Sequence, residues 1–136
     1  MLMAIPVLAA FEVFGQGSST VNYRGSTLGI FAEYPSRIRH GTQEEVTVHV
    51  TNRGSVALDT VTVLFDSSYV ARFGAVQFLP SPTDVYVVKL AGVGPGETRA
   101  VRLSLRANKY GRHRGRIAAA HAGDTARVTV NTIVFP

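Results

Sequence analysis

The residues in this chain best suited to chemistry are basic, and half of them lie in one short run. Seven of the fourteen Lys and Arg residues fall within eighteen positions, namely Arg99, Arg102, Arg106, Lys109, Arg112, Arg114 and Arg116. A guanidinium forms paired hydrogen bonds with a carboxylate or a phosphate, so the run favours docking on an anionic partner. The alternative interpretation is a solvated outer face that happens to be rich in arginine.

The four histidines form no catalytic or metal-binding pattern. No two of them have the i, i+4 spacing that places a pair of zinc ligands on one face of a helix. We therefore expect surface histidines, with His40 in a turn, His49 on the solvent face of a strand, His113 in a basic loop and His121 at the end of a strand.

Signatures of other site chemistry are equally weak. Gly25–Gly29 lacks the Gly-x-Ser-x-Gly spacing of a nucleophile elbow, and strand geometry would send the adjacent Glu44–Glu45 pair to opposite faces. Asp66 and Asp84 lack the close Asp-x-Asp spacing that gathers calcium ligands. Gly92–Glu97 leads into a predicted strand, so it indicates a turn and not a phosphate cradle at a helix N-terminus. The sequence predicts no enzyme, no metal and no cofactor.

Length, cysteine content and charge narrow the possibilities further. A chain of 136 residues is long enough for one domain with a buried core, and the absence of cysteine excludes disulfides, thiolate zinc sites and a cysteine nucleophile. The formal net charge of +5 favours anionic partners such as phospholipid headgroups, acidic proteins or acidic polymers. Nucleic acid is not expected as a partner, because Tyr110 alone gives the basic run no platform for stacking bases.

The first fourteen residues are apolar, with Glu12 as their one charged residue. As a helix they would span about 21 Å, against about 30 Å for the hydrocarbon core of a bilayer. A secretory signal, a buried segment of the domain, and the outer part of an anchor that other residues or subunits complete all stay open. We expect 1–14 to be membrane-associated and 15–26 to be a polar linker. The expected membrane contacts are Met1, Leu2, Ile5, Val7, Leu8, Phe11 and Phe14.

Residues 27–136 alternate apolar and polar side chains with the period of two that is typical of β-strands. Strands are predicted over 27–34, 44–52, 57–65, 85–90, 98–107, 116–121 and 127–134. Turns are expected at 37–41 and 52–55, an irregular region at 69–78 and a basic loop or strand end at 108–115. Seven to nine strands with regularly spaced turns predict an all-β, immunoglobulin-like antiparallel sandwich with no helix beyond the N-terminal segment.

Three segments carry a resemblance to a known family. Val46–Gly54, Gly94–Thr98 and Val101–Ala107 resemble bacterial immunoglobulin-like modules of the cell-adhesion-related, CARDB/DUF11-like kind. Val13–Gln16, with the ending Val130–Pro136, resembles membrane-anchored extracytoplasmic proteins of high-GC bacteria, in which the first of these segments closes a transmembrane helix. The resemblance implies an immunoglobulin-like topology and no catalysis.

The expected function is that of a non-catalytic, membrane-tethered accessory or scaffolding subunit on the extracytoplasmic side, periplasmic or at the cell surface. The apolar N-terminal segment would contact partner transmembrane helices or the lipid bilayer, and the Arg-rich edge would meet an acidic surface of a membrane protein complex. The alternative is a binding module for an anionic cell-envelope polymer or glycan. An enzyme would need a pocket in which His and Asp or Glu converge, which residue spacing does not reveal.

Overall fold

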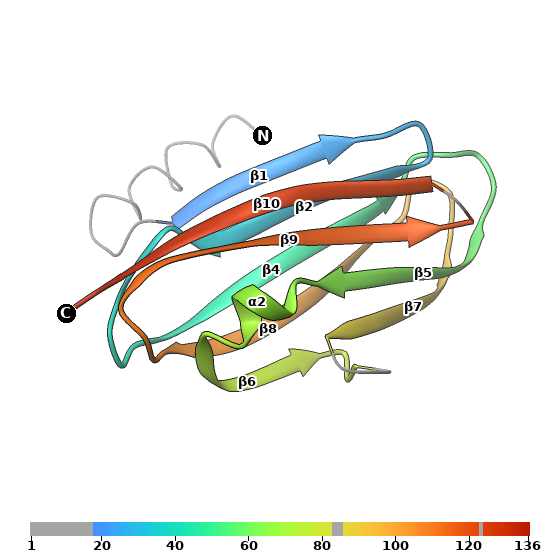
Figure 1. Cartoon of the computed structure of the whole chain (residues 1–136). Coiled ribbons are helices and arrows are strands. Elements are labelled where there is room, and N and C mark those ends of the chain that lie inside the picture. Colours follow the sequence, from blue (N-terminus) through green and yellow to red (C-terminus); the bar gives the residue numbers. More distant parts are fainter. Residues whose placement is uncertain (1–17, 83–85, 123) are drawn as a thin grey trace, which may run out of the picture.

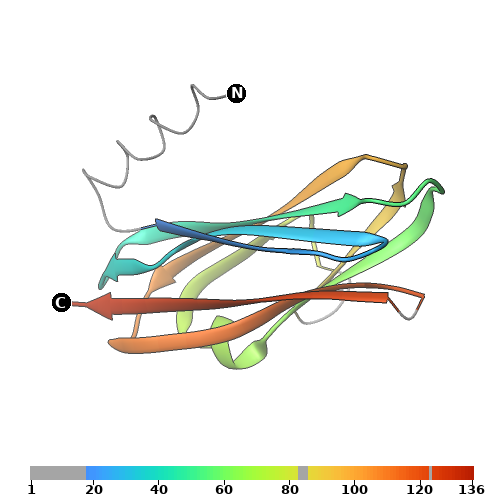
Figure 2. The ribbon, with the colours of Figure 1, turned by 90° about the horizontal axis from the view of Figure 1, so that it is seen from above.

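Two five-stranded sheets pack face to face in the computed structural model, which describes residues 18–82, 86–122 and 124–136 (Figures 1 and 2). The predicted membrane segment, 1–14, lies outside the described residues. The first sheet contains, in spatial order, β1 (Ser18–Arg24), β2 (Leu28–Pro35), β4 (Gln43–Asn52), β8 (Thr98–Ala107) and β6 (Phe73–Leu79). The second contains β3 (Arg37–Arg39), β10 (Asp124–Phe135), β9 (Gly111–His121), β5 (Leu58–Phe65) and β7 (Val87–Val93).

Alternating valines and leucines fill the space between the sheets. On β4, Val46, Val48 and Val50 are fully buried, and their neighbours on β8 are equally buried because Val46 pairs with Leu103 and Val48 with Val101. Burying each such side chain stabilises the fold by about 1.5–3 kcal/mol. The predicted all-β sandwich is confirmed, because the strands form two five-stranded sheets with one shared core of buried apolar side chains.

Two strands lie where the sequence predicts a linker and a turn. Within the predicted linker 15–26, Ser18–Arg24 form β1, which pairs with β2 from Ser18 opposite Pro35 to Arg24 opposite Gly29. Within the predicted turn 37–41, Arg37–Arg39 form β3, which runs parallel to the end of β10. Both strands lie at sheet edges, where much of the surface is solvated, so their composition stays polar and the apolar period is faint.

A one-turn helix, α2 (Ser67–Val70), replaces the first part of the predicted irregular region and contradicts the expectation of no helix there. Asp66 caps it, because the carboxylate accepts hydrogen bonds from the Ser68 backbone N–H at 3.0 Å and from its hydroxyl at 2.7 Å. The helix turns Tyr69 and Val70 into the core. No helix within the described ranges combines the length and apolar character needed to cross a membrane.

The predicted closing pair of strands is confirmed as the β9–β10 hairpin, with longer strands than expected. β9 begins at Gly111, inside the predicted basic loop 108–115, and β10 begins at Asp124. Arg127 pairs with Ala118 and Ile133 with Arg112, which fixes the outer surface of the second sheet.

Candidate functional site: an arginine face on the second sheet

The structure divides the predicted basic run between the two outer surfaces of the sandwich. On β8, Arg102 and Arg106 alternate with buried residues and lie on the outside of the first sheet, as their spacing predicts. On β9, Arg112, Arg114 and Arg116 alternate with buried residues in the same way, but on the outside of the second sheet. Because β8 and β9 belong to different sheets, the two halves of the run face away from each other.

The two other basic residues of the run, Arg99 and Lys109, lie in or beside the loops that flank β8. Arg99 donates from Nε to Glu97 Oε2 at 2.6 Å and from Nη2 to the Gly92 carbonyl at 2.8 Å, so it holds the β7–β8 turn. The hydrogen bond from Arg99 is the main reason that the pKa of Glu97 lies below its usual value. Lys109 lies in the exposed loop between β8 and β9.

Two arginines from outside the run join the β9 half. Arg127 is brought in by the hairpin register, and Arg37 of β3 by its pairing with Ile133, which in turn lies opposite Arg112. We call this surface the arginine face; its five exposed arginines are Arg37, Arg112, Arg114, Arg116 and Arg127. No outward position of β3, β9 or β10 carries a carboxylate.

The arginine face is not neutralised by the described residues of the chain. Among these residues, the two ion pairs between side chains are Arg99 with Glu97 and His49 with Glu33, and neither pair lies on the arginine face. Asp66, at the margin of the face, is held by Ser68, whose hydrogen bonds are the main cause of its lowered pKa, with a smaller contribution from the charge of Arg116. The face therefore presents unpaired positive charge to solvent.

Two shallow hollows lie on this face and share Arg114. The larger, of about 660 Å³, has Ile133 as its apolar residue and is otherwise lined by Tyr34, Ser36, Arg37, Arg112, Arg114 and Asn131. The smaller, of about 290 Å³, is lined by Asp66, Arg114, Gly115, Arg116 and Thr129. Guanidinium, hydroxyl and amide groups can all donate hydrogen bonds to an anionic or polyhydroxylated ligand.

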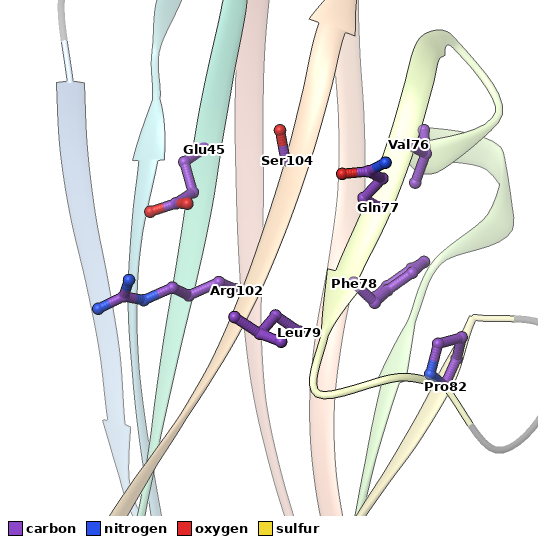
Figure 3. A pocket seen from close by; sticks show the side chains of 8 residues that line it. All are labelled: Glu45, Val76, Gln77, Phe78, Leu79, Pro82, Arg102 and Ser104. Atoms are coloured by element: carbon purple, nitrogen blue, oxygen red, sulfur yellow. The ribbon is translucent and has the colours of Figure 1, made fainter.

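A third hollow lies on the opposite sheet and has a mixed character (Figure 3). It measures about 540 Å³ and combines the apolar Val76, Phe78, Leu79 and Pro82 with Glu45, Gln77, Arg102 and Ser104. Glu45 and Arg102 project from the neighbouring strands β4 and β8. Because a carboxylate offsets the single guanidinium, this hollow is a weaker site for anions than the arginine face.

His113 corrects the prediction of four surface histidines. It is 1% exposed, packs edge-on against Phe73 and donates from Nε2 to the Lys109 carbonyl at 2.8 Å. Its Nδ1 has no hydrogen-bond partner within the described chain. The prediction failed because β9 already starts at Gly111. His113 is therefore a strand residue, and its side chain points into the core on the same side of the strand as Gly115.

The remaining histidines are dispersed over the molecule. His40 stacks on Tyr110, with ring centroids 4.7 Å apart, and His49 lies 3.1 Å from a carboxylate oxygen of Glu33. His121 contacts a backbone carbonyl of β5 through Nδ1 at 2.7 Å. No group of three or more His, Asp or Glu residues within 18–82, 86–122 and 124–136 is placed to hold a metal ion. Asp84, considered above with Asp66, lies outside these ranges.

Sequence reasoning could have found one of the two added arginines. Pairing the two predicted strands of the closing hairpin across their turn places Arg127 beside Ala118, on the same side as Arg116. Arg37 carried no such signal, because a three-residue parallel strand has neither a hairpin register nor an apolar repeat long enough to recognise.

Comparison with known proteins identifies the fold. No family model and no curated protein matches the chain. The solution structure of the CARDB domain of PF1109 from Pyrococcus furiosus is 16% identical, with a TM-score of 0.55 over 79% of this chain and 94% of that domain. Its crystal structure, in complex with di-metal ions, is 14% identical, with a TM-score of 0.57 over 86% and 95%. The TM-scores and coverage establish a shared CARDB-like, immunoglobulin-like fold, and at such low sequence identity they establish nothing beyond it.

Proposed function

We propose that this chain is a non-catalytic accessory subunit, tethered to a membrane by its apolar first residues, that docks on an acidic surface of a membrane protein complex at the extracytoplasmic side. An immunoglobulin-like sandwich suggests an interaction module. The observation that carries the proposal is the arginine face, where the β9–β10 hairpin and the short strand β3, far from it in sequence, bring arginines together without a carboxylate at any outward position.

The spacing of the face suits an extended or helical acidic partner. Residues two apart on a strand are about 6.6 Å apart, so Arg112, Arg114 and Arg116 form a row about 13 Å long. A partner strand repeats its side chains at the same interval, and a helix presents residues i and i+4 at about 6 Å. Guanidinium–carboxylate pairs across such a contact speed association and favour acidic partners over neutral or basic ones.

The shifted ionisable groups support a non-catalytic role. Burial raises the pKa of Glu44, and burial is also the main reason that the pKa of Tyr69 rises to about 12. Hydrogen bonds from their neighbours lower the pKa of Asp66 and Glu97. Each shift has a local structural cause, and these groups do not share a hollow in the described structure.

The docking proposal is tested by extracting the tagged full chain in mild detergent and measuring its native size and co-purifying chains. We expect the wild type to run as a large complex and Arg116→Glu/Arg127→Glu to lose its partner or bind it at least tenfold more weakly. The matched control is Arg24→Glu/Arg53→Glu, which makes the same charge change on two exposed residues of the first sheet, at the end of β1 and just after β4. A wild-type chain that runs as a lone monomer refutes the proposal.

A second candidate is binding of an anionic cell-envelope polymer or glycan, which the larger hollow favours. Beside its three arginines it offers the hydroxyls of Tyr34 and Ser36 and the amide of Asn131, the groups that a polyol with negative charges would use. Sedimentation with purified cell-wall material separates the two candidates. Arg112→Ala/Arg114→Ala should abolish co-sedimentation if the polymer binds there, and an unchanged bound fraction removes this candidate.

A further inference from the structure

One end of the sandwich concentrates basic residues from both sheets. β1, β4 and β9 begin at this end, and β2, β8 and β10 finish there. Backbone hydrogen bonds from His40 to Phe135 and from Gly41 to Ala107, both 2.8 Å, join the two sheets at this end. We call it the entry end, because the described chain starts there at Ser18, near the carboxyl end of β10 (Figure 1).

Basic side chains outnumber carboxylates at the entry end. Arg106 at the end of β8, Lys109 in the following loop and Arg112 at the start of β9 flank Tyr110 in the sequence, and Tyr110 is 61% exposed. The short strand β3 adds Arg37 and Arg39, and Arg39 lies over the Phe135 ring at 5.7 Å. Among the described residues, the carboxylates near this end are Glu44 and Glu45, near the start of β4, and Glu33, two residues before the end of β2. The entry end is thus cationic, with an aromatic residue at its tip.

Covalent geometry ties the entry end to the apolar segment. Four residue steps separate Phe14 from Ser18, and an extended chain spans at most about 3.6 Å per step. Ser18 therefore lies within about 14 Å of Phe14. If residues 1–14 are inserted in a membrane, as the proposed function holds, the entry end must lie close to the level of the phospholipid headgroups.

We propose that the entry end docks on the bilayer itself, through contacts of Arg106, Lys109 and Arg112 with the phosphates of anionic phospholipids. The inference rests on the membrane tether in the proposed function but does not require the acidic protein partner. Tyrosine suits the interface because its ring is apolar and its hydroxyl is polar. Ile133 lies opposite Arg112, and Arg127 lies six residues from Ile133 along β10, so Arg127 is about 20 Å from the proposed lipid contact at Arg112. This distance is about two Debye lengths, so the part of the arginine face around Arg127 stays free to bind a protein.

The test measures the position of the entry end above a membrane. Because the chain contains no cysteine, Asn108→Cys in the β8–β9 loop accepts a single fluorophore in the full-length protein. The labelled chain is reconstituted in bilayers of phosphatidylcholine, with or without phosphatidylglycerol, that carry a quencher on the headgroups. Ser55→Cys, in the exposed turn after β4, is the control label, because the ten residues of β4 separate the two ends by roughly 30 Å.

We expect phosphatidylglycerol to increase quenching at position 108 but not at position 55, and 1 M salt to reverse the increase. Each basic residue near an anionic surface changes the docked-to-undocked ratio about fivefold, so Arg106→Gln/Lys109→Gln should lower the ratio about 25-fold. Arg24→Gln/Arg53→Gln, which removes the same charge at the far end, should match the wild type. Neither pair lies on the arginine face, so loss of the protein partner and loss of lipid docking are separate results.

Three results would overturn the inference. Equal quenching in neutral and anionic bilayers would show that the lipid charge is not recognised. An unchanged ratio for Arg106→Gln/Lys109→Gln would show that these side chains do not make the contact. Release by soluble glycerol phosphate at constant ionic strength would indicate a discrete phosphate pocket in place of a surface that faces the membrane.

Discussion

A buried relay of hydrogen bonds between the two sheets gives the sharpest stability prediction. The Thr132 hydroxyl donates to the Pro35 carbonyl at 2.7 Å, because a carbonyl can only accept. The Thr132 oxygen must then accept the hydrogen bond from the Tyr69 hydroxyl at 2.8 Å. The relay therefore runs from α2 through β10 to β2, and all three of its groups are buried.

The direction of the relay predicts unequal costs for removing its members. Tyr69→Phe deletes the terminal donor and leaves the bond from Thr132 intact, so it should cost about 1 kcal/mol. Thr132→Val leaves the Tyr69 hydroxyl and the Pro35 carbonyl buried without partners and should cost about 2–4 kcal/mol. The double variant leaves only the carbonyl unpaired, so it should cost about 1–2 kcal/mol less than the sum of the single changes.

Urea unfolding followed by circular dichroism measures these free energies. If the double variant is additive within about 0.5 kcal/mol, or if the two single variants cost the same, the deduced direction is wrong. A pH series adds an independent check on Tyr69, whose pKa burial raises to about 12. The unfolded chain ionises this tyrosine near pH 10, so about 3 kcal/mol of stability present below pH 10 should be lost by pH 12. Tyr69→Phe should remove that part of the loss.

Three further changes test other features of the fold. Gly115→Ala should lower stability by about 3 kcal/mol or prevent folding, as read from the urea midpoint, because its Cβ would overlap the Cβ of Tyr69. Asn52→Ala should cost about 3 kcal/mol in the same assay, since the buried amide donates to the carbonyls of two chain segments at 2.8 and 3.1 Å. Asp66→Asn should flatten the acid limb of stability measured from pH 6 to 2. Hydrogen bonds from Ser68 lower the pKa of Asp66, so its contribution is present above the unfolded pKa near 4 and is lost as the pH falls.

Residue alternation predicted the strands whose two faces differ most. Along the middle of β4 and β8 the inward residues Val46–Val50 and Val101–Ala107 are apolar and alternate with polar outward residues, so the predicted bounds 44–52 and 98–107 match the structure within one residue. β1 was missed because its exposed edge position demands little apolar surface, and β3 because three residues are too few to show a period. The start of β9 was missed because small and basic residues occupy its first positions, with His113 as the one large inward side chain.

The candidate site was only half predictable for a related reason. Alternation tells which residues of a strand point away from the core, and it placed Arg102 and Arg106 on one outer surface correctly. It does not tell which sheet a strand joins, and that assignment sends Arg112 and Arg114 to the opposite side of the molecule. Sheet membership depends on long-range pairing, such as that of β9 with β5, which a local pattern of residues does not record.

The needs of the fold do not explain why the arginine face lacks carboxylates. Arg112 and Arg114 lie about 7 Å apart on one strand, and two such charges repel each other by about 0.6 kcal/mol even in bulk water. Asn131, which lies opposite Arg114 on β10, is exposed, so a carboxylate there would offset the repulsion without disturbing the core. The fold would tolerate an acidic neighbour at this position, and stability alone would favour one. Under the docking proposal, an acidic partner would bring the compensating negative charge, and the energy of docking would then include relief of this repulsion.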